Sequence, residues 1–253
     1  MTLLERLLAV IDADERAVLF TVVEGEGLGS KLLVLEDGEQ HGEGRHELLG
    51  YVDELLRSGR NRLLDLDGAK VFAEVYGPPP RLLVFGAVDT AEALCRAAKL
   101  LGWRTVVADA RARFATAERI PSADEVLVAW PEEALAEVQP DHSTAIVVLT
   151  HDDKFDIPAL AGALMTNAFY IGALGSRRNQ ERRRRRLLEA GLSEAQVERV
   201  SGPCGLDIGA DTPTETAFSI LAEALAVRAG RAGGRLRDAT GRIHVEPDLA
   251  ARS

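Results

Sequence analysis

Between Arg81 and Arg228, short apolar runs alternate with segments of helical periodicity, and this alternation restricts the possible fold more than any other feature of the chain. The apolar runs are RLLVFGA, RTVVADA, DEVLVAW, TAIVVLT and AFYIGAL. Because adjacent positions in each run are apolar, we expect both faces of each strand to be buried, as in a parallel sheet covered by helices. The sequence therefore predicts an α/β fold with a Rossmann-like, doubly wound parallel sheet at residues 81–229.

Residues 1–77 have a different organisation. An amphipathic helix, two strand-like runs and a second helix precede the segment LLDLDGAKVFAEVY, in which Asp67 and Gly68 predict a tight hairpin. These elements indicate a smaller N-terminal α+β module. Gly77 is followed by three prolines, which cannot donate backbone hydrogen bonds, so we expect a stiff linker there. Residues 230–253 are rich in glycine and arginine and are predicted to form a separate tail.

The charge and composition of the chain argue against several classes of function. With 30 basic and 40 acidic residues the formal net charge is −10, which disfavours nucleic acid as a main partner because phosphate binding draws on a broad basic surface. No apolar run is long enough to span a membrane, and the N-terminus lacks the basic start of a signal peptide, so we expect a cytoplasmic protein. Cys95 and Cys204 have no zinc-binding spacing, so no metal site is predicted.

In a doubly wound sheet, ligands bind beyond the carboxyl ends of the strands, and the first such turn contains Gly86. A dinucleotide fingerprint needs a second glycine there, whereas this chain has Val88 and then Asp89, so the signal for NAD(P) is weak. Asp89 to Glu92 instead matches a capping box. Asp109, about twenty residues downstream, allows two interpretations: an acid that binds a ribose, or an ordinary residue at a strand end.

The fourth strand ends in THDDKFD, which places Thr150, His151 and Asp152 at the carboxyl edge of the sheet. A histidine beside carboxylates can act as a base, a metal ligand or a hydrogen-bond donor, but it can also be a loop residue bonded to the backbone. Asp156 precedes Pro158 by two residues and is predicted to cap the next helix.

Seven arginines follow the turn at Gly175 and Ser176, where Ser176 is the predicted N-cap of a helix. Arg177 and Arg178 would lie at the positive end of the helix dipole, where each cation costs roughly 0.3–1 kcal/mol. This unfavourable placement indicates a bound anion, which arginine can grip with two hydrogen bonds. The remaining arginines, Arg182 to Arg186, wrap around the helix and are predicted to form a solvated basic face.

A glycine-rich loop, SGPCGLDIGAD, precedes a strong helix start at Thr212, with proline at the first helical position and a capping glutamate. Cys204, Gly205 and Asp207 belong to this loop. Such a loop can line a binding site, although a plain connection between elements is as common. Cys204 could meet a soft metal or a sulfur-bearing ligand, or it could be an inert buried thiol.

YIGALGSRR, followed by GLDIGADTPTETAFSILAE, closely resembles the XdhC/CoxI family, accessory proteins for the maturation of molybdenum hydroxylases such as xanthine dehydrogenase and carbon monoxide dehydrogenase. The resemblance implies binding of the molybdenum cofactor in its molybdopterin form, help with its sulfuration, and insertion into an apo-hydroxylase. A cysteine desulfurase and a second copy of the chain are further candidate partners. The candidate cofactor-binding residues are Gly86, Asp109, Thr150, His151, Asp152, Gly172, Gly175, Ser176, Arg177, Arg178, Cys204, Gly205 and Asp207.

Two departures from the family pattern restrict what the resemblance implies. Many members have a Gly-Ala-Gly turn where this chain has GAVDTA, so NAD binding is not carried over, and the N-terminal module here lacks the cysteine of the family pattern. Two other functions stay open. One is a nucleotide-dependent oxidoreductase with Asp109 on a ribose and His151 as acid or base. The other is an adaptor whose arginine helix docks an acidic partner.

Overall fold

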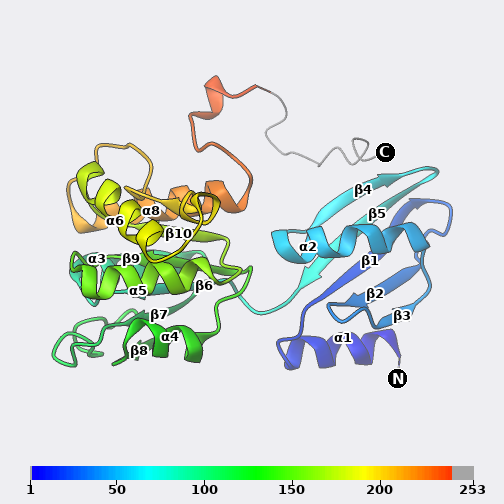
Figure 1. Ribbon diagram of the computed structural model, residues 1–253. Helices are drawn as coiled ribbons and strands as arrows, with labels where there is room; N and C mark the ends of the chain where they lie inside the picture. Colours follow the sequence, from blue (N-terminus) through cyan, green and yellow to red (C-terminus); the bar gives the residue numbers. More distant parts are fainter. Residues whose placement is uncertain (1, 241–253) are drawn as a thin grey trace. The chain divides into compact units, whose positions relative to one another are not determined.

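A computed structural model describes residues 2–240 of the chain (Figure 1). Contacts between residues divide it into two compact units, and the boundary lies between Pro78 and Pro79. The second unit extends to Gly233. Residues 241–253 of the predicted tail lie outside the described residues.

The first unit is a five-stranded antiparallel sheet of order β3-β2-β1-β5-β4. Its elements are α1 (Leu3–Asp12), β1 (Ala17–Gly25), β2 (Lys31–Leu35), β3 (Gln40–Gly42), the 3₁₀ helix η1 (His46–Tyr51), α2 (Val52–Ser58), β4 (Arg62–Leu66) and β5 (Ala69–Tyr76). Side chains alternate along β1, so Val18 and Phe20 pack with α2 on one face, while Leu19 packs with α1 on the other (Figure 1). The hairpin predicted at Asp67 and Gly68 is confirmed, because Leu66 pairs with Ala69.

The second unit is a six-stranded parallel sheet of order β11-β10-β9-β6-β7-β8, which confirms the predicted α/β, doubly wound fold. Its elements are β6 (Arg81–Phe85), α3 (Asp89–Leu100), β7 (Arg104–Ala108), β8 (Glu125–Leu127), α4 (Pro131–Val138), β9 (Thr144–Val148), α5 (Asp153–Leu164), β10 (Tyr170–Ala173), α6 (Arg177–Glu189), α7 (Glu194–Val197), β11 (Val200–Ser201) and α8 (Pro213–Arg228). A short 3₁₀ helix, η2 (Leu236–Asp238), follows the unit. The strand order reverses between β6 and β9, which is where such sheets bind ligands.

Helices cover both faces of the parallel sheet, as the apolar strands require. Leu82 and Val84 of β6 pack against α3 and α8, while Leu83 and Phe85 pack against α4 and α5. All four side chains are buried. Close packing on both faces fixes the strand ends, so the loops at the carboxyl edge start from a rigid base.

Three helix starts in the second unit depend on local hydrogen bonds. Ser176 accepts from the backbone N–H of Asn179 at 3.3 Å, and Thr212 forms a capping box with Glu215, as the sequence predicts. Asp152 caps α5 by accepting from the N–H of Lys154 at 3.0 Å. No helix within residues 2–240 combines the length and the apolar character needed to cross a membrane.

The capping box predicted for α3 is wrong. The N-cap is Val88, without a side-chain hydrogen bond, and Asp89 is already the first residue of the helix. Glu92 instead accepts from the backbone N–H and the hydroxyl of Ser122, at 3.0 and 2.6 Å. Its partner lies thirty residues away in sequence, so a tertiary contact replaces the local one.

Candidate functional site

A buried ion pair joins the loops that follow β9 and β10. Arg183 of α6 and Asp156 of α5 are 2% and 0% exposed, and Arg183 Nε donates to Asp156 Oδ2 at 2.8 Å. The same guanidinium donates to the carbonyl oxygens of Leu174, at 2.7 Å, and Thr150, at 2.9 Å. The hydroxyl of Thr150 donates to Asp156 in turn. One arginine therefore holds the ends of both loops in place.

Two predictions are wrong at this pair. Asp156 does not cap α5, because the helix begins three residues earlier and the carboxylate is buried. Arg183 does not belong to a solvated face, because it shares a buried stripe of α6 with Leu187. The spacing of Arg183 and Leu187, four residues apart, is the sequence signal that could have shown it.

Most of the other arginines of α6 have acidic partners on neighbouring helices. Arg182 and Arg186 pair with Asp153 at 3.0 and 3.6 Å, and Arg184 pairs with Glu194. The charge that looks like one basic patch in the sequence is therefore largely neutralised within the fold.

Three arginines of this helix have no acidic partner in the described part of the chain: Arg177, Arg178 and Arg185. Arg177 and Arg178 form the first turn of α6, which contains no acidic residue. Both side chains are exposed. Their charge adds to the positive end of the helix dipole and is available to an anion from solvent.

Gly175 and Gly172 lie directly before these arginines. Gly175 has φ +141°, and a Cβ there would lie 3.2 Å from Arg183 Nη1, so glycine suits both the conformation and the close approach of the arginine. Gly172 is buried inside β10, where a Cβ would lie 2.7 Å from the hydroxyl of Tyr170. The turn into α6 is thus shaped by packing on its inner side and open on its outer side.

The crevice between β6 and β9 is nearly filled by protein side chains. Its cavity measures only about 10 Å³ and is lined by Gly86, Thr150 and Phe155 among others. Gly86 has φ +107°, and a Cβ there would lie 2.9 Å from Thr150 Cγ2. Trp130 stacks on Phe155 at 5.0 Å, which closes the crevice further. The space suffices for about one water molecule and not for a dinucleotide.

Asp109 lies beside this crevice, and both of its carboxylate oxygens already accept hydrogen bonds. Oδ2 accepts from the N–H of Ala87 at 3.0 Å and from Arg111 Nη2 at 2.7 Å, and Oδ1 accepts from the backbone N and from Nε of Arg111, both at 2.9 Å. Burial alone would raise the pKa of Asp109, but the hydrogen bonds from Arg111 and Ala87 outweigh it, so the pKa is lowered. A ribose would have to displace these donors.

His151 and Asp152 are exposed in the loop that follows β9. The carboxylate of Asp152 is used as the cap of α5. His151 makes no side-chain hydrogen bond to any residue in the described range 2–240. Both residues are adjacent to Thr150, whose carbonyl oxygen is bound by Arg183.

The loop after β11 is held against the sheet by Glu223 of α8. Its carboxylate accepts from the hydroxyl of Tyr170 and, at 2.8 Å, from the N–H of Gly205. The backbone N–H of Cys204 donates to the carbonyl oxygen of Ala173 at 3.1 Å. Asp207, further along the loop, is exposed. The loop is therefore anchored at Cys204 and Gly205 and open at Asp207.

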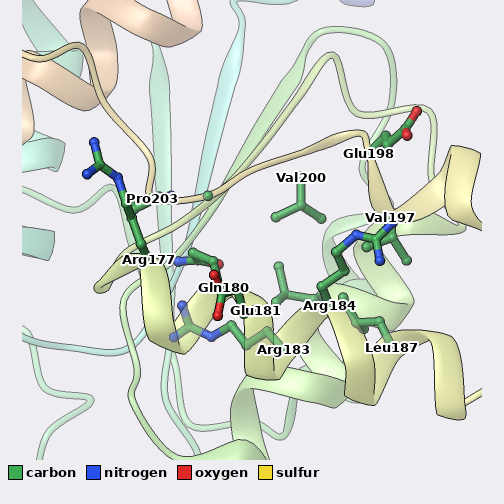
Figure 2. A pocket seen from close by; sticks show the side chains of 12 residues that line it. Arg177, Gln180, Glu181, Arg183, Arg184, Leu187, Val197, Glu198, Val200 and Pro203 are labelled. Atoms are coloured by element: carbon green, nitrogen blue, oxygen red, sulfur yellow. The ribbon is translucent and has the colours of Figure 1, made fainter.

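A larger cavity, of about 460 Å³, lies between α6, α7 and the loop at Gly202 and Pro203 (Figure 2). Arg177 is at one end of it beside Pro203, and Arg184 is at the other end (Figure 2). Within residues 2–240 there is no group of three or more His, Cys, Asp or Glu side chains placed to hold a metal ion. The free arginines thus border the larger cavity rather than the filled crevice.

Comparison with known proteins explains this arrangement. The family model of the XdhC Rossmann domain matches residues 82–224, which include the arginine helix, the buried ion pair and the loop after β11. The chain belongs to the XdhC family. The XdhC domain accounts for nearly the whole second unit.

Relatives and a solved structure extend the similarity. The chain is 34% identical to the uncharacterized protein YqeB of Escherichia coli over 174 residues, covering 67% of this chain and 31% of YqeB. It is 34% identical to a probable xanthine dehydrogenase subunit from Bacillus subtilis over 158 residues, covering 62% and 46%. It is also 34% identical to the molybdenum cofactor insertion chaperone PaoD of Escherichia coli over 153 residues, covering 60% and 42%. The chain matches less than half the length of each of these relatives.

The crystal structure of a xanthine dehydrogenase from Bacillus halodurans is similar, with a TM-score of 0.68 and 25% identity. The match covers 90% of this chain and 66% of that one.

The two thiols of the chain should react slowly in the folded state. Burial, and then the nearby Glu223 carboxylate, raises the pKa of the half-buried Cys204 in the XdhC domain to about 12, and burial raises that of Cys95 to about 12. At about pH 8 we expect alkylation by iodoacetamide to be on the order of a thousandfold slower than for a free cysteine, because the thiolate is the nucleophile. Mass spectrometry of the alkylated peptides measures both sites.

Unfolding in guanidinium chloride should restore the rate of a free thiol at both positions, which controls for peptide recovery. Rapid alkylation of Cys204 in the folded chain would show that the thiolate is stabilised there, and would contradict the neutral thiol that the structure indicates.

Proposed function

We propose that this chain is a cytoplasmic accessory protein that binds the molybdenum cofactor and assists its insertion into a molybdenum hydroxylase such as xanthine dehydrogenase. Membership of the XdhC family and the similarity to a molybdenum cofactor insertion chaperone support this function. The observation that carries the proposal is the pair of free arginines, Arg177 and Arg178, in the first turn of α6 beside a cavity of about 460 Å³.

The chemistry of the cofactor suits this place. Molybdopterin ends in a phosphate, and the first turn of a helix offers an anion both backbone N–H groups and a positive dipole end. Arg177 and Arg178 add two guanidinium groups that can each donate two hydrogen bonds to phosphate oxygens. Because the chain carries a formal net charge of −10, an anion needs such a local positive site to bind at all.

We expect the variant Arg177→Ala/Arg178→Ala to lose bound pterin. The full chain is co-expressed with a complete molybdenum cofactor pathway and purified, and the fluorescence of oxidised pterin released from it is measured. Each charged hydrogen bond removed should weaken binding by about 1.5–3 kcal/mol, so the double variant should retain less than about a hundredth of the wild-type affinity.

Arg185→Ala is the matched control, since Arg185 is an exposed arginine of the same helix without an acidic partner in residues 2–240. It should retain pterin as the wild type does. Equal retention by the double variant and the wild type would remove the arginine turn from the site, and absence of pterin from the wild type would overturn the proposed function.

The finer steps are part of the same proposal. We propose that sulfur for the cofactor comes from a cysteine desulfurase partner rather than from this chain, because the raised pKa of Cys204 leaves its thiol protonated near neutral pH. The client is proposed to be a xanthine dehydrogenase or a carbon monoxide dehydrogenase. An oxidoreductase function that uses the Rossmann crevice is disfavoured, because that crevice is filled and Asp109 is engaged by Arg111.

A further inference from the structure

The cavity beside α6 has a polar side and an apolar side. Leu160, Leu187, Val197 and Val200 form the apolar part, whereas the polar part comes from charged and amide side chains of α6 together with Glu198. Its volume of about 460 Å³ lies within the range of small-molecule sites, roughly 300–1,000 Å³. Such a mixed lining suits a flat, partly polar molecule rather than a purely apolar one.

Several polar groups of the cavity are already satisfied by the protein. Arg183 is bound to Asp156, Arg184 pairs with Glu194, and Gln180 Nε2 donates to the carbonyl oxygen of Ala173 at 2.9 Å. These three side chains therefore build the wall and have little left to offer a ligand.

The charged groups that remain are Arg177, Glu181 and Glu198, none of which has an ion-pair partner among residues 2–240. Glu198 lies at the end of the cavity opposite Arg177 (Figure 2). Glu181 is four residues after Arg177, so both project from one side of α6, about 6 Å apart along the helix axis. The cavity thus presents one free cation and, one helical turn further, one free carboxylate.

We propose that this cavity receives the ring of a planar heterocycle that carries an anionic group at one end and an amidine edge, a ring N–H beside an exocyclic amino group, at the other. Arg177 binds the anionic group and Glu181 accepts the two N–H groups of the amidine edge. This inference rests on the proposed function, because pterins have such an edge, and it extends that function by assigning recognition of the ring to Glu181.

The geometry of a carboxylate explains the assignment. Its two oxygens lie side by side and can accept two parallel N–H groups, as they do from arginine, and the charge strengthens both hydrogen bonds. Leu187, Val197 and Val200 offer apolar contacts to the faces of the ring. A heterocycle with a carbonyl oxygen in place of the amino group would put its oxygen against the carboxylate and would be rejected.

The test compares two fluorescent ligands that differ only at this edge. Pterin-6-carboxylate has the amidine edge, and lumazine-6-carboxylate has a second carbonyl group instead. Binding to the full chain is measured by titration of ligand fluorescence for the wild type, Glu181→Gln, Arg177→Ala and the control Arg185→Ala. We expect the wild type to prefer the pterin.

Glu181→Gln should weaken pterin binding at least about tenfold and change lumazine binding little, because only the pterin donates to the carboxylate. Arg177→Ala should weaken both ligands, and Arg185→Ala neither. Equal binding of the pterin by Glu181→Gln and the wild type, or no preference of the wild type between the ligands, overturns the inference. If the co-expressed chain still retains pterin, that result leaves the proposed function standing, whereas a chain that retains none refutes the function itself.

Discussion

Replacing Arg183 by methionine should lower the free energy of unfolding of the XdhC domain by about 3–5 kcal/mol. Methionine leaves the carboxylate of Asp156 buried without a cation, and leaves the carbonyl oxygens of Thr150 and Leu174 without their donor. Removing one partner of a buried pair costs far more than removing an exposed ion pair, because the remaining charge cannot reach water.

Urea unfolding followed by tryptophan fluorescence measures this effect directly. The chain has two tryptophans, Trp103 and Trp130, and both belong to the second unit, so the signal reports on that unit. The control Arg185→Met removes an exposed arginine from the same helix and should change the stability by less than about 0.5 kcal/mol.

The double variant Arg183→Met/Asp156→Leu tests the cause. If the cost comes from an unpaired buried charge, removing both charges should recover much of the lost stability. Equal stability of Arg183→Met and Arg185→Met would show that the buried ion pair does not hold the two loops together.

Gly205→Ala should also destabilise the XdhC domain, by about 3 kcal/mol. Gly205 has φ +108°, which L-residues rarely adopt, and a Cβ there would lie 2.4 Å from Ser219 Oγ. Ser219 is buried and its hydroxyl donates to the carbonyl oxygen of Leu206 at 2.6 Å, so it cannot move aside easily. Backbone strain of roughly 1–3 kcal/mol and overpacking of a similar size both contribute.

Gly209 in the same loop provides the matched control. Its φ is +71°, and a Cβ there would have nothing within 4 Å, so Gly209→Ala should cost only about 1 kcal/mol. The same urea titration compares the two variants. A loss for Gly205→Ala no larger than that for Gly209→Ala would mean that the loop shifts freely, and that Glu223 does not fix it.

The sequence was sufficient for those features that depend on local pattern. The buried strands are apolar on both faces, which predicts a parallel sheet, and the caps at Ser176 and Thr212 use residues only three positions apart. β11 was missed because a strand of two residues, Val200 and Ser201, is too short for any periodicity to appear.

The polar contacts of the candidate site could not be predicted, because they join residues that are far apart in sequence. Asp156 and Arg183 are 27 residues apart, and each had a plausible local role, as a cap or as a solvated charge. For Asp109 the sequence left two interpretations open. Its hydrogen bond to Ala87 spans 22 residues and became visible only when β6 and β7 were placed side by side.

The single guanidinium that holds Thr150 and Leu174 also has a kinetic consequence. Loops tied together before a ligand arrives need not be ordered by it, so association is not slowed by a folding step and little conformational entropy is lost on capture. A carrier built this way is governed by how fast its cargo leaves. Rapid delivery would then require the recipient to compete for the cargo or to disturb the arginine turn, because the holding site itself has little freedom to open.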